Sequence, residues 1–389
     1  MNSFACYRMP YAEEYVRVEQ LDGEPCRLAS AMDLEGREGF VFAPFVVTDD
    51  CPLLLIRPDR VTCVKVMKDE GRRMKDDGKG MKDDGRGMKD EGRRMKEDES
   101  MFNLQSSTFN VQRSMHDRAV YHQCFEMFHH ELQEGRFRKI VLARQSKDEI
   151  EDDIDAEQLF LRACQSYPRM FVALVSTRES GTWLMATPEV LLQDAGGLYS
   201  TMALAGTMVL RGRHLKFDTP LQTADGGIRW SDKNIEEQRL VATYIYERLE
   251  SLALNIEEQG PRTVRAGNLA HLRSDFRFTL REGKGVGAVL EALHPTPAVC
   301  GIPKGEAMDF ILANESAPRR YYSGYCGPLN LAVEAQDERS TSLFVSLRCM
   351  QMDGRTCMLH AGGGLLKESS EQLEWDETEA KMQTMRNLY

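Results

Sequence analysis

The sequence predicts an α+β fold, that is, a single α/β unit in which layers of strands and helices pack together without regular alternation along the chain. Short apolar runs typical of strands recur along the chain. Stretches with helical spacing of apolar residues lie between them. The two kinds of element do not alternate in a regular βαβ rhythm, and this irregular order favours α+β layering over a doubly wound parallel sheet.

Bulk properties exclude several classes of protein. The 389 residues suffice for two average domains or one large one, and 42% hydrophobic residues can fill a core. A net charge of -11 argues against binding of nucleic acid or of an anionic membrane in bulk, although a cleft can still hold a small anion. No apolar run approaches the ~20 residues that span a bilayer, no leader pattern opens the chain, and ten scattered cysteines contain no C-x-x-C pair. We therefore expect a cytoplasmic protein.

The elements follow in order along the chain. Residues 39–56 contain two apolar runs that indicate strands and turns. Residues 121–132 have helical spacing, and Gly135 can end that helix in a left-handed conformation. Strands are predicted over 139–144, 170–176, 182–186, 342–350 and 356–361, and helices over 237–252 and 288–293.

A charged repeat interrupts the chain. From Met67 to Ser100 a seven-residue unit recurs, MKDEGRR, MKDDGKG, MKDDGRG, MKDEGRR and MKEDES. Each unit has one apolar residue, whereas a coiled coil needs two per heptad. The repeat cannot bury enough apolar surface to offset its ordering entropy, so we expect a disordered, solvated insert. The alternative is a charged docking segment.

Three acidic residues stand on predicted helices. Glu237 follows a helix start at Ser231 and begins an apolar face, so an acid there can point inward. Glu374 and Glu377 are three residues apart and would share one helix face. Carboxylates are the ligands that Mg2+ prefers. The alternative is that these residues lie on solvated helix faces, as most glutamates do.

Two runs of small residues and one lysine add to this set. Residues 203–207 and 361–364 would let backbone N–H groups approach an anion, although a simple turn explains each run as well. Lys139 begins an apolar strand. At an exposed strand end it would be solvated, whereas a buried lysine can serve as a general base.

Together these stretches resemble the chorismate-utilising enzymes, a family that includes isochorismate, salicylate, anthranilate and aminodeoxychorismate synthases. The resemblance covers about 114–389 and rests on the order of nine motifs. They are Arg138-Lys-Ile-Val-Leu-Ala-Arg, Ala186-Thr-Pro-Glu189, Ala203-Leu-Ala-Gly-Thr207, His271-Leu272, Leu293-His-Pro-Thr-Pro-Ala298, Tyr322-Ser-Gly324, Leu347-Arg348, Ala361-Gly-Gly-Gly364 and Glu374-Trp-Asp-Glu-Thr-x-x-Lys381.

The resemblance implies a fold and a division of the chain. The family has a single large chorismate-binding fold of the anthranilate synthase component I type, with two antiparallel sheets packed as a core, helices outside and a deep cleft. Residues 1–66 would form the N-terminal part of this fold, residues 67–100 the insert, and residues 101–389 the chorismate-binding catalytic region.

Three positions imply the reaction within the family. Lys139 stands where water-using members resemble each other in carrying a lysine, Ala205 where aminodeoxychorismate synthases place a nucleophilic lysine, and Ala298 where pyruvate-eliminating members tend to carry threonine. They imply an isomerase that converts chorismate to isochorismate, for menaquinone or siderophore biosynthesis. The alternatives are salicylate synthase or another pyruvate-releasing chorismate lyase, and a non-catalytic chorismate-binding protein.

The resemblance also assigns roles. It makes Lys139 the base that activates water and Glu189 the acid that protonates the leaving hydroxyl, with Mg2+ held by Glu237, Glu374 and Glu377. Asn234 replaces an acid that relatives often carry, which implies weaker Mg2+ affinity. The residues implied to bind chorismate are Ala205, Gly206, Thr207, His271, Ala298, Tyr322, Arg348, Gly362, Gly363 and Lys381. The expected partner is this small molecule alone, with no nucleic acid and no membrane, in a monomer or weak dimer.

Overall fold

The computed structural model describes residues 3–66, 100–151, 153–210, 221, 228–266, 269–333 and 338–389, without the side chains of 100–116. The chain forms two compact units, one of Met1–Val66 with Tyr121–Tyr389 and one of Met67–Val120. The fold described below is that of the first unit. The predicted disordered insert lies, apart from its last residue, outside the described residues.

Nine strands form the first sheet, called sheet A here, and all neighbours in it are antiparallel. Their order across the sheet is β14 (Gly301–Ile302), β7 (Lys139–Glu149), β18 (Thr356–Leu365), β17 (Cys349–Asp353), β9 (Gly181–Thr187), β8 (Phe171–Thr177), β1 (Ser3–Arg8), β2 (Glu14–Gln20) and β6 (Arg60–Lys65). The pairing of β7 with β18 places the strand of Lys139 beside the glycine run.

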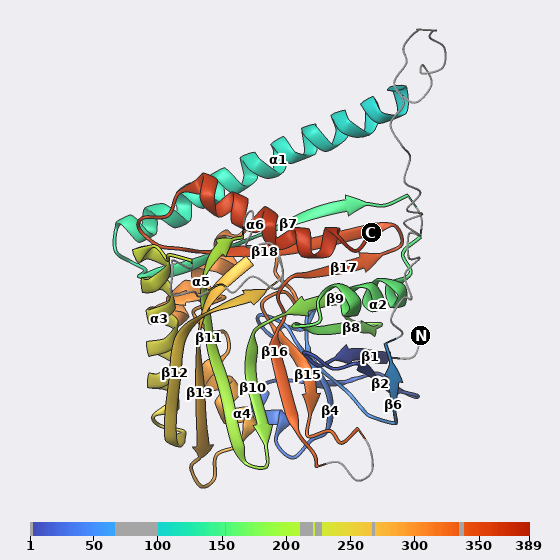
Figure 1. Ribbon diagram of the computed structural model, residues 1–389, viewed down its shortest axis with the longest axis vertical. Coiled ribbons are helices and arrows are strands. Elements are labelled where there is room, and N and C mark those ends of the chain that lie inside the picture. Colours follow the sequence, from blue (N-terminus) through green and yellow to red (C-terminus); the bar gives the residue numbers. More distant parts are fainter. Residues whose placement is uncertain are drawn as a thin grey trace, which may run out of the picture. The chain divides into compact units, whose positions relative to one another are not determined.

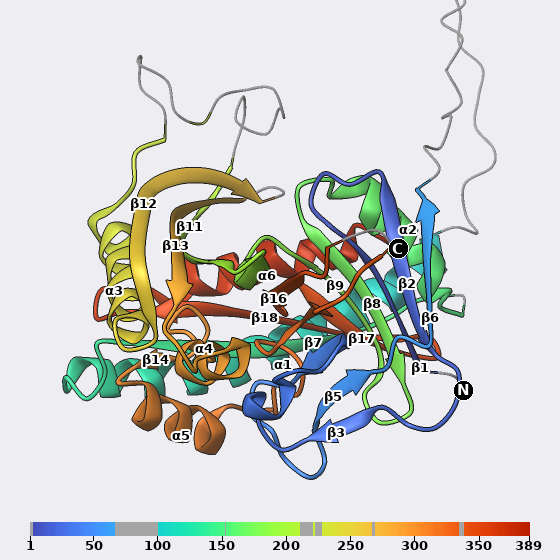
Figure 2. The ribbon, with the colours of Figure 1, turned by 90° about the horizontal axis from the view of Figure 1, so that it is seen from below.

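Nine further strands form sheet B, again antiparallel throughout. Their order is β12 (Ala253–Ala266), β13 (Leu269–Leu280), β11 (Leu198–Val209), β10 (Val190–Ala195), β16 (Thr341–Val345), β15 (Tyr325–Leu329), β4 (Gly39–Ala43), β5 (Leu53–Ile56) and β3 (Cys26–Leu28). Figure 2 shows β12 and β13 bending together side by side.

The two sheets pack face to face through aromatic side chains. Phe171 of sheet A stacks on Phe344 of sheet B with ring centroids 4.1 Å apart. Trp183 of sheet A meets Phe42 of sheet B edge to face at 6.3 Å. All four side chains are buried, and such pairs add to the free energy gained by burying their area. The prediction of two antiparallel sheets packed as a core is therefore confirmed.

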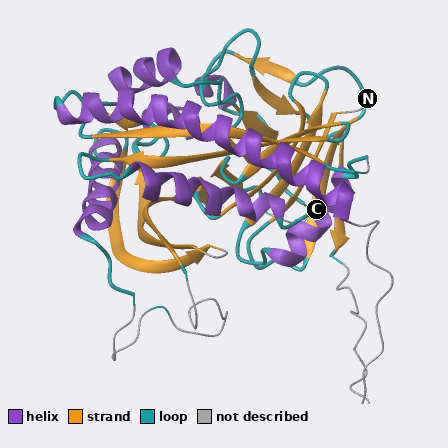
Figure 3. Ribbon diagram, turned by 90° about the horizontal axis from the view of Figure 1, so that it is seen from above, coloured by secondary structure: helices purple, strands orange, loops and turns teal. Residues whose placement is uncertain are grey.

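Helices pack on the outside of this core (Figure 3). They are the part of α1 (Ser100–Gln133) from Tyr121 on, α2 (Ala156–Ser166), α3 (Asp232–Leu249), α4 (Val286–Leu293), α5 (Lys304–Asn314) and α6 (Glu371–Arg386), with a 3-10 turn η1 (Ala31–Leu34). Helix α3 packs on β11 and α6 on β18, as Figure 1 shows. Within the described parts of the chain, none of these helices is long and apolar enough to cross a membrane.

Helix α3 begins at the helix start that the sequence predicted, Ser231. The Ser231 side chain accepts a hydrogen bond from the backbone N–H of Asn234, so the cap lies before the first buried residue. The buried face then carries Leu240, Val241, Tyr244, Ile245 and Leu249. Glu237 and Gln238 share this buried stretch. Gln238 bonds to the backbone of β11 in sheet B, whereas the carboxylate of Glu237 lies 3.0 Å from Lys139 of sheet A.

The prediction of one strand over 342–350 is wrong. The segment forms β16 in sheet B and β17 in sheet A, joined by a link that crosses between the sheets. The link turns at Arg348, whose φ is +38°, a backbone conformation that side-chain-bearing residues rarely adopt. The crossing, Ser346-Leu-Arg348, alternates polar and apolar residues as a continuing strand would, so periodicity alone could not reveal it. The other predicted strands and helices are present, and Gly135 has the expected left-handed φ of +78°.

Candidate active site

Two crossings of the chain between the sheets lie side by side. The first joins β9 to β10 and carries Glu189, and the second joins β16 to β17 and carries Arg348. The N–H of Val345 donates to the carbonyl of Glu189 at 3.0 Å, and the N–H of Ala186 donates to the carbonyl of Arg348 at 3.1 Å. Both side chains are buried, at 3% and 4% exposure. The crossings therefore bring a buried acid and a buried guanidinium into one place.

Burial decides the protonation of Glu189. Removal from water raises the pKa of its carboxyl to about 7, against the opposing attraction of Arg348, Lys139 and Lys381. A group with such a pKa holds a proton on a substantial fraction of molecules at neutral pH. Glu189 can therefore donate a proton to a reacting group in the cavity.

Lys139 is the first residue of β7 and is fully buried, so the solvated alternative is wrong. Its Nζ lies 3.0 Å from Oε1 of Glu237, close enough for an ion pair but without the geometry of a hydrogen bond. A Cβ at Gly364 on the neighbouring strand would lie 2.7 Å from Cε of Lys139. The glycine therefore makes room for the lysine side chain.

Three carboxylates reach the site from two helices, Glu237 from α3 and Glu374 and Glu377 from α6. Burial raises the pKa of Glu374 to about 7, and the charge of Glu377 adds to the rise. Burial opposes ionisation of Glu377 as well, but Lys381, whose Nζ lies 2.7 Å away, outweighs it and lowers the pKa of Glu377. The solvated alternative is therefore wrong for all three acids, since none of them is exposed.

The residues present fit a divalent cation. Oε2 of Glu374 is buried without a hydrogen-bond partner among the described residues. A Cβ at Gly363 would lie 2.9 Å from that oxygen, and a Cβ at Gly364 would lie 2.3 Å from Oε1 of Glu237. The glycine run of β18 thus leaves open space beside two carboxylates, and carboxylate oxygens are the donor set that Mg2+ takes.

Arg348 is held by a histidine. Its Nη2 donates to Nε2 of His271 at 2.7 Å, and Nδ1 of His271 lies 3.3 Å from the carbonyl of Gly206. Burial, reinforced by the charge of Arg348, lowers the pKa of His271 well below its usual value. The imidazole is therefore neutral, with its proton on Nδ1. Nη1 of Arg348 is buried without a hydrogen-bond partner in the described chain, which leaves it available to an anion.

Two glycines, Gly206 and Gly362, let the backbone approach neighbouring groups closely at the site. Gly206 forms a bulge in β11 with φ of +71°, and a Cβ there would lie 2.9 Å from the carbonyl of Asn234. Nζ of Lys381 donates to the carbonyl of Gly362 at 2.8 Å. A Cβ at Gly362 would lie 2.9 Å from the hydroxyl of Tyr322. Glycine is therefore required at both positions for close approach of the backbone.

These residues line a single cavity. Of the positions expected to bind substrate, it is lined by Ala205, Gly206, Thr207, His271, Ala298, Tyr322, Arg348, Gly362 and Lys381, together with Glu189 and Glu237. Lys139, Glu374, Glu377 and Gly363 are not in the lining; Lys139 lies behind Glu237, and Gly363 lies against Glu374. The free space is about 50 Å³, roughly room for one or two waters. The cavity thus brings Glu189, the guanidinium of Arg348 and the carboxylate of Glu237 together.

Three residues of the site were not singled out in the sequence. Gly364 belongs to the glycine run and Lys233 to the helix start at Ser231, but other residues of these two motifs were the predicted site residues. His360 had no signal. It stacks between Trp183 and Tyr322, and burial lowers its pKa to about 3, so it lines the cavity as a neutral ring.

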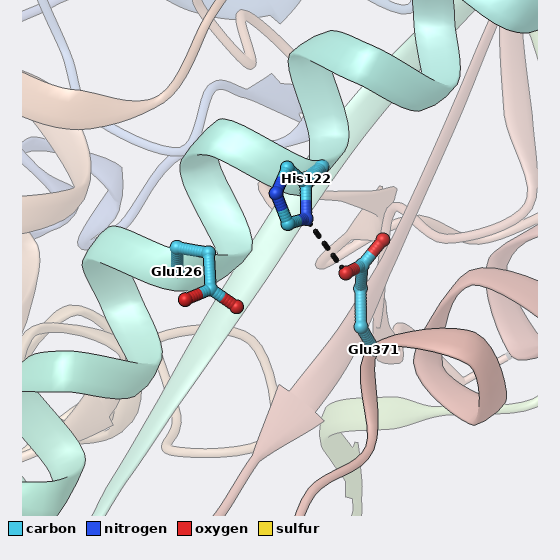
Figure 4. Close-up of side chains that lie close together, drawn as sticks. All are labelled: His122, Glu126 and Glu371. Carbon is cyan, nitrogen blue, oxygen red and sulfur yellow. Dashed lines mark hydrogen bonds and ion pairs between the residues drawn. The ribbon is translucent and has the colours of Figure 1, made fainter.

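A second cluster of possible metal ligands lies apart from this cavity. His122, Glu126 and Glu371 have ligand atoms within 4.8 Å of one another (Figure 4). The ion pair between Nδ1 of His122 and Glu371 at 2.8 Å accounts for their approach, and the imidazole side chain is 57% exposed. An ordinary surface ion pair explains this cluster without a metal.

Known structures share the architecture. The isochorismate synthase DhbC of Bacillus anthracis, described as 2,3-dihydroxybenzoate-specific, superposes with a TM-score of 0.70 at 19% identity, over 99% of this chain and 95% of that one. The menaquinone-specific isochorismate synthase MenF of Escherichia coli gives 0.70 at 19% identity, over 100% and 88%. Anthranilate synthase component I of Streptococcus pneumoniae gives 0.64 at 15% identity, over 98% and 92%. The fold is therefore the one these enzymes share, as expected.

Sequence comparison places the chain within that class. The family model described as "Chorismate binding enzyme" matches residues 74–388, and the protein belongs to this family. Isochorismate synthase MenF of Escherichia coli is 27% identical over 272 residues, 70% of this chain and 60% of that protein. The salicylate biosynthesis isochorismate synthase of Pseudomonas aeruginosa is 32% identical over 258 residues, 66% and 51%. The aligned part thus spans between half and two thirds of these relatives' length.

Proposed function

We propose that the protein is a Mg2+-dependent isochorismate synthase, an isomerase that adds water at one ring carbon of chorismate and removes the hydroxyl from another. The observation that carries the proposal is that Glu189, a buried acid with a pKa of about 7, shares one cavity with Glu237, whose carboxylate lies 3.0 Å from the amine of the buried Lys139. Relatives that bear the name isochorismate synthase support it.

The two side chains divide the proton transfers. Lys139 would act as the base that takes a proton from water while the water oxygen bonds to the ring. Glu189 gives its proton to the departing hydroxyl, which leaves as water. Addition and departure need a base and an acid at separate points, and a buried amine and a buried carboxylic acid meet that need.

The remaining residues bind and orient the substrate. Glu237, Glu374 and Glu377 would hold Mg2+, which when bound would neutralise the ring carboxylate and fix its orientation. Arg348, with Nη1 unengaged and Nη2 held by His271, would bind the enolpyruvyl carboxylate together with Tyr322.

One assay tests the reaction. The purified protein is mixed with chorismate and Mg2+, the ring products are separated by chromatography, and pyruvate is measured in the same tube. Isochorismate without pyruvate is the expected result. Salicylate with pyruvate would move the protein to the alternative, salicylate synthase, and chorismate left unchanged would refute both.

Asn234 offers a test of the metal assignment. Its side-chain amide lies 3.5 Å from the carbonyl of Thr207, in the first turn of the helix that carries Glu237. We expect Asn234→Asp to tighten divalent-cation binding about tenfold, since it adds one negative charge near the cation. Mn2+ titration followed by electron paramagnetic resonance measures this affinity. Asn234→Ala, which adds no charge, serves as control, and equal affinities in the two variants would contradict the prediction.

The charged repeat should be dispensable for catalysis. All proposed site residues lie at or beyond Lys139, and the motifs begin after the repeat. Removing residues 67–100 should therefore leave kcat/KM for chorismate unchanged within the error of the assay. A deletion variant that folds, as shown by circular dichroism, but has lost turnover would assign the segment a catalytic role.

Cellular context is proposed from weaker support. Menaquinone biosynthesis is favoured because a relative is MenF, although DhbC and EntC are also among the similar isochorismate synthases. The scattered cysteines support a cytoplasmic location, and the net charge of -11 argues against nucleic acid and membrane as partners. A monomer or weak dimer remains a prediction.

A further inference from the structure

Lys233 is a third lysine among the proposed metal carboxylates, and no role has been assigned to it so far. It is the second residue of α3, and its ammonium forms an ion pair with Oε1 of Glu374 on α6. The lysine side chain is 23% exposed and the glutamate side chain 2%. A cation in the first turn of a helix opposes the helix dipole, so helix stability gives no reason for a lysine at this position. The contact with Glu374 does.

The site pairs each carboxylate with one lysine. Lys139 lies at Glu237, Lys381 at Glu377 and Lys233 at Glu374. Lys139 is fixed within β7, and Lys381 is also bonded to the carbonyl of Gly362. The Lys233 side chain has no hydrogen-bond partner besides Glu374 in the described part of the chain, and at 23% exposure it is the most exposed of the three lysine side chains, so it has a path toward solvent.

Lys233 also acts on all three carboxylates. Burial alone would lower its pKa, but Glu374, Glu237 and Glu377 together raise it. The ammonium of Lys233 occupies one oxygen of a carboxylate that is proposed to bind the metal. Oε1 of Glu374 is engaged by Lys233 and by Ser369 at 2.9 Å, while Oε2 remains without a partner beside Gly363.

We propose that Lys233 is a built-in counter-cation that neutralises Glu374 in the metal-free protein and must withdraw when a divalent cation binds. This inference rests on the metal role proposed above for the three glutamates. Repulsion between the ammonium and a doubly charged ion in a largely buried site weakens metal binding as long as the lysine stays. Lys233 thereby sets the metal affinity of the site without itself being a metal ligand.

The test measures metal binding directly, without substrate. Mn2+ is titrated into the purified full-length protein, and free Mn2+ is followed by electron paramagnetic resonance. Lys233→Met is expected to bind Mn2+ at least tenfold more tightly than the wild type. Lys233→Arg, which keeps the charge, should bind no more tightly than the wild type. Arg239→Met removes the same charge from an exposed position on the same helix and should leave the affinity unchanged.

Three outcomes would overturn the proposal. They are unchanged or weaker Mn2+ binding by Lys233→Met, equal tightening by Arg239→Met, and tightening that persists when Glu374→Gln is added to Lys233→Met. Thermal unfolding supplies a second readout, because Lys233→Met should have a lower Tm without metal and a larger rise in Tm on adding Mn2+. If Lys233→Met does not fold, Lys233→Gln takes its place with the same expectations.

Failure of this inference can be told apart from failure of the proposed function. A wild-type protein that forms isochorismate, with a Lys233→Met variant that binds Mn2+ no more tightly, refutes the counter-cation and leaves the isomerase standing. A wild-type protein that leaves chorismate unchanged refutes the isomerase, whatever the Mn2+ titrations show.

Discussion

Lys139→Ala is expected to lower kcat for isochorismate formation by about 10³-fold, while chorismate still binds. The amine is the only basic group of the proposed acid–base pair, and it is fully buried, so bulk water cannot replace it freely. The rate is measured by chromatography of the products, and binding by isothermal titration calorimetry. Lys147→Ala, at the exposed end of the same strand, is the matched control and should retain the wild-type rate.

The buried ion pair requires a check on folding. Removing one partner leaves Glu237 without its lysine, and breaking a buried pair typically costs about 3–5 kcal/mol. Lys139→Met keeps the volume of the side chain, so its unfolding temperature should lie closer to that of the wild type than the temperature of Lys139→Ala. A folded Lys139→Met variant with wild-type turnover would remove the lysine from the mechanism.

Glu189→Gln is expected to lower kcat by roughly 10²-fold or more, the usual contribution of a general acid. Glutamine keeps the shape of the side chain but has no acidic proton to donate. KM should change less than kcat, because Arg348, rather than Glu189, is proposed to bind a substrate carboxylate. Equal losses in kcat for Glu189→Gln and for Gln193→Ala, at a half-buried site further along β10, would point to general damage instead.

The pH profile gives the same residue a distinct signature. Burial raises the pKa of Glu189 from 4.5 to about 7, so the acid form is lost as pH rises through 7. We expect the wild-type rate to fall about tenfold per pH unit above that value, and Glu189→Gln to lack this limb. Because the folded protein keeps a proton here between pH 4.5 and 7 that the unfolded chain releases, stability falls as pH rises across that window.

Much of the site could be predicted because it is local in sequence. The glycine run, the pair Glu374 and Glu377 and the capped helix of Glu237 each lie within a few residues, and the order of the motifs identified the family to which the chain belongs. The fold followed from that resemblance, and superposition on known enzymes confirmed it. Periodicity alone indicated only an α+β class.

What could not be predicted depends on contacts between distant segments. The segment 342–350 breaks into two strands at the crossing that ends with Arg348. The alternation of polar and apolar residues does not change there, so the sequence gives no sign of the break. In the sequence, Lys233 is an ordinary helix residue, and its contact with Glu374, 141 residues further on, follows only from the fold. His360 reads as a strand residue until Trp183 and Tyr322 enclose it.

The two adjacent crossings make the proposed chemistry depend on how the two sheets are placed relative to each other. Lys139 stands on sheet A and the bulge at Gly206 on sheet B. Glu189 and Arg348 belong to neither sheet, because each lies on a link that joins one sheet to the other. Neither sheet alone therefore contains both members of the proposed acid–base pair. A substitution that shifts one sheet against the other would therefore displace the carboxyl of Glu189 and the guanidinium of Arg348 together.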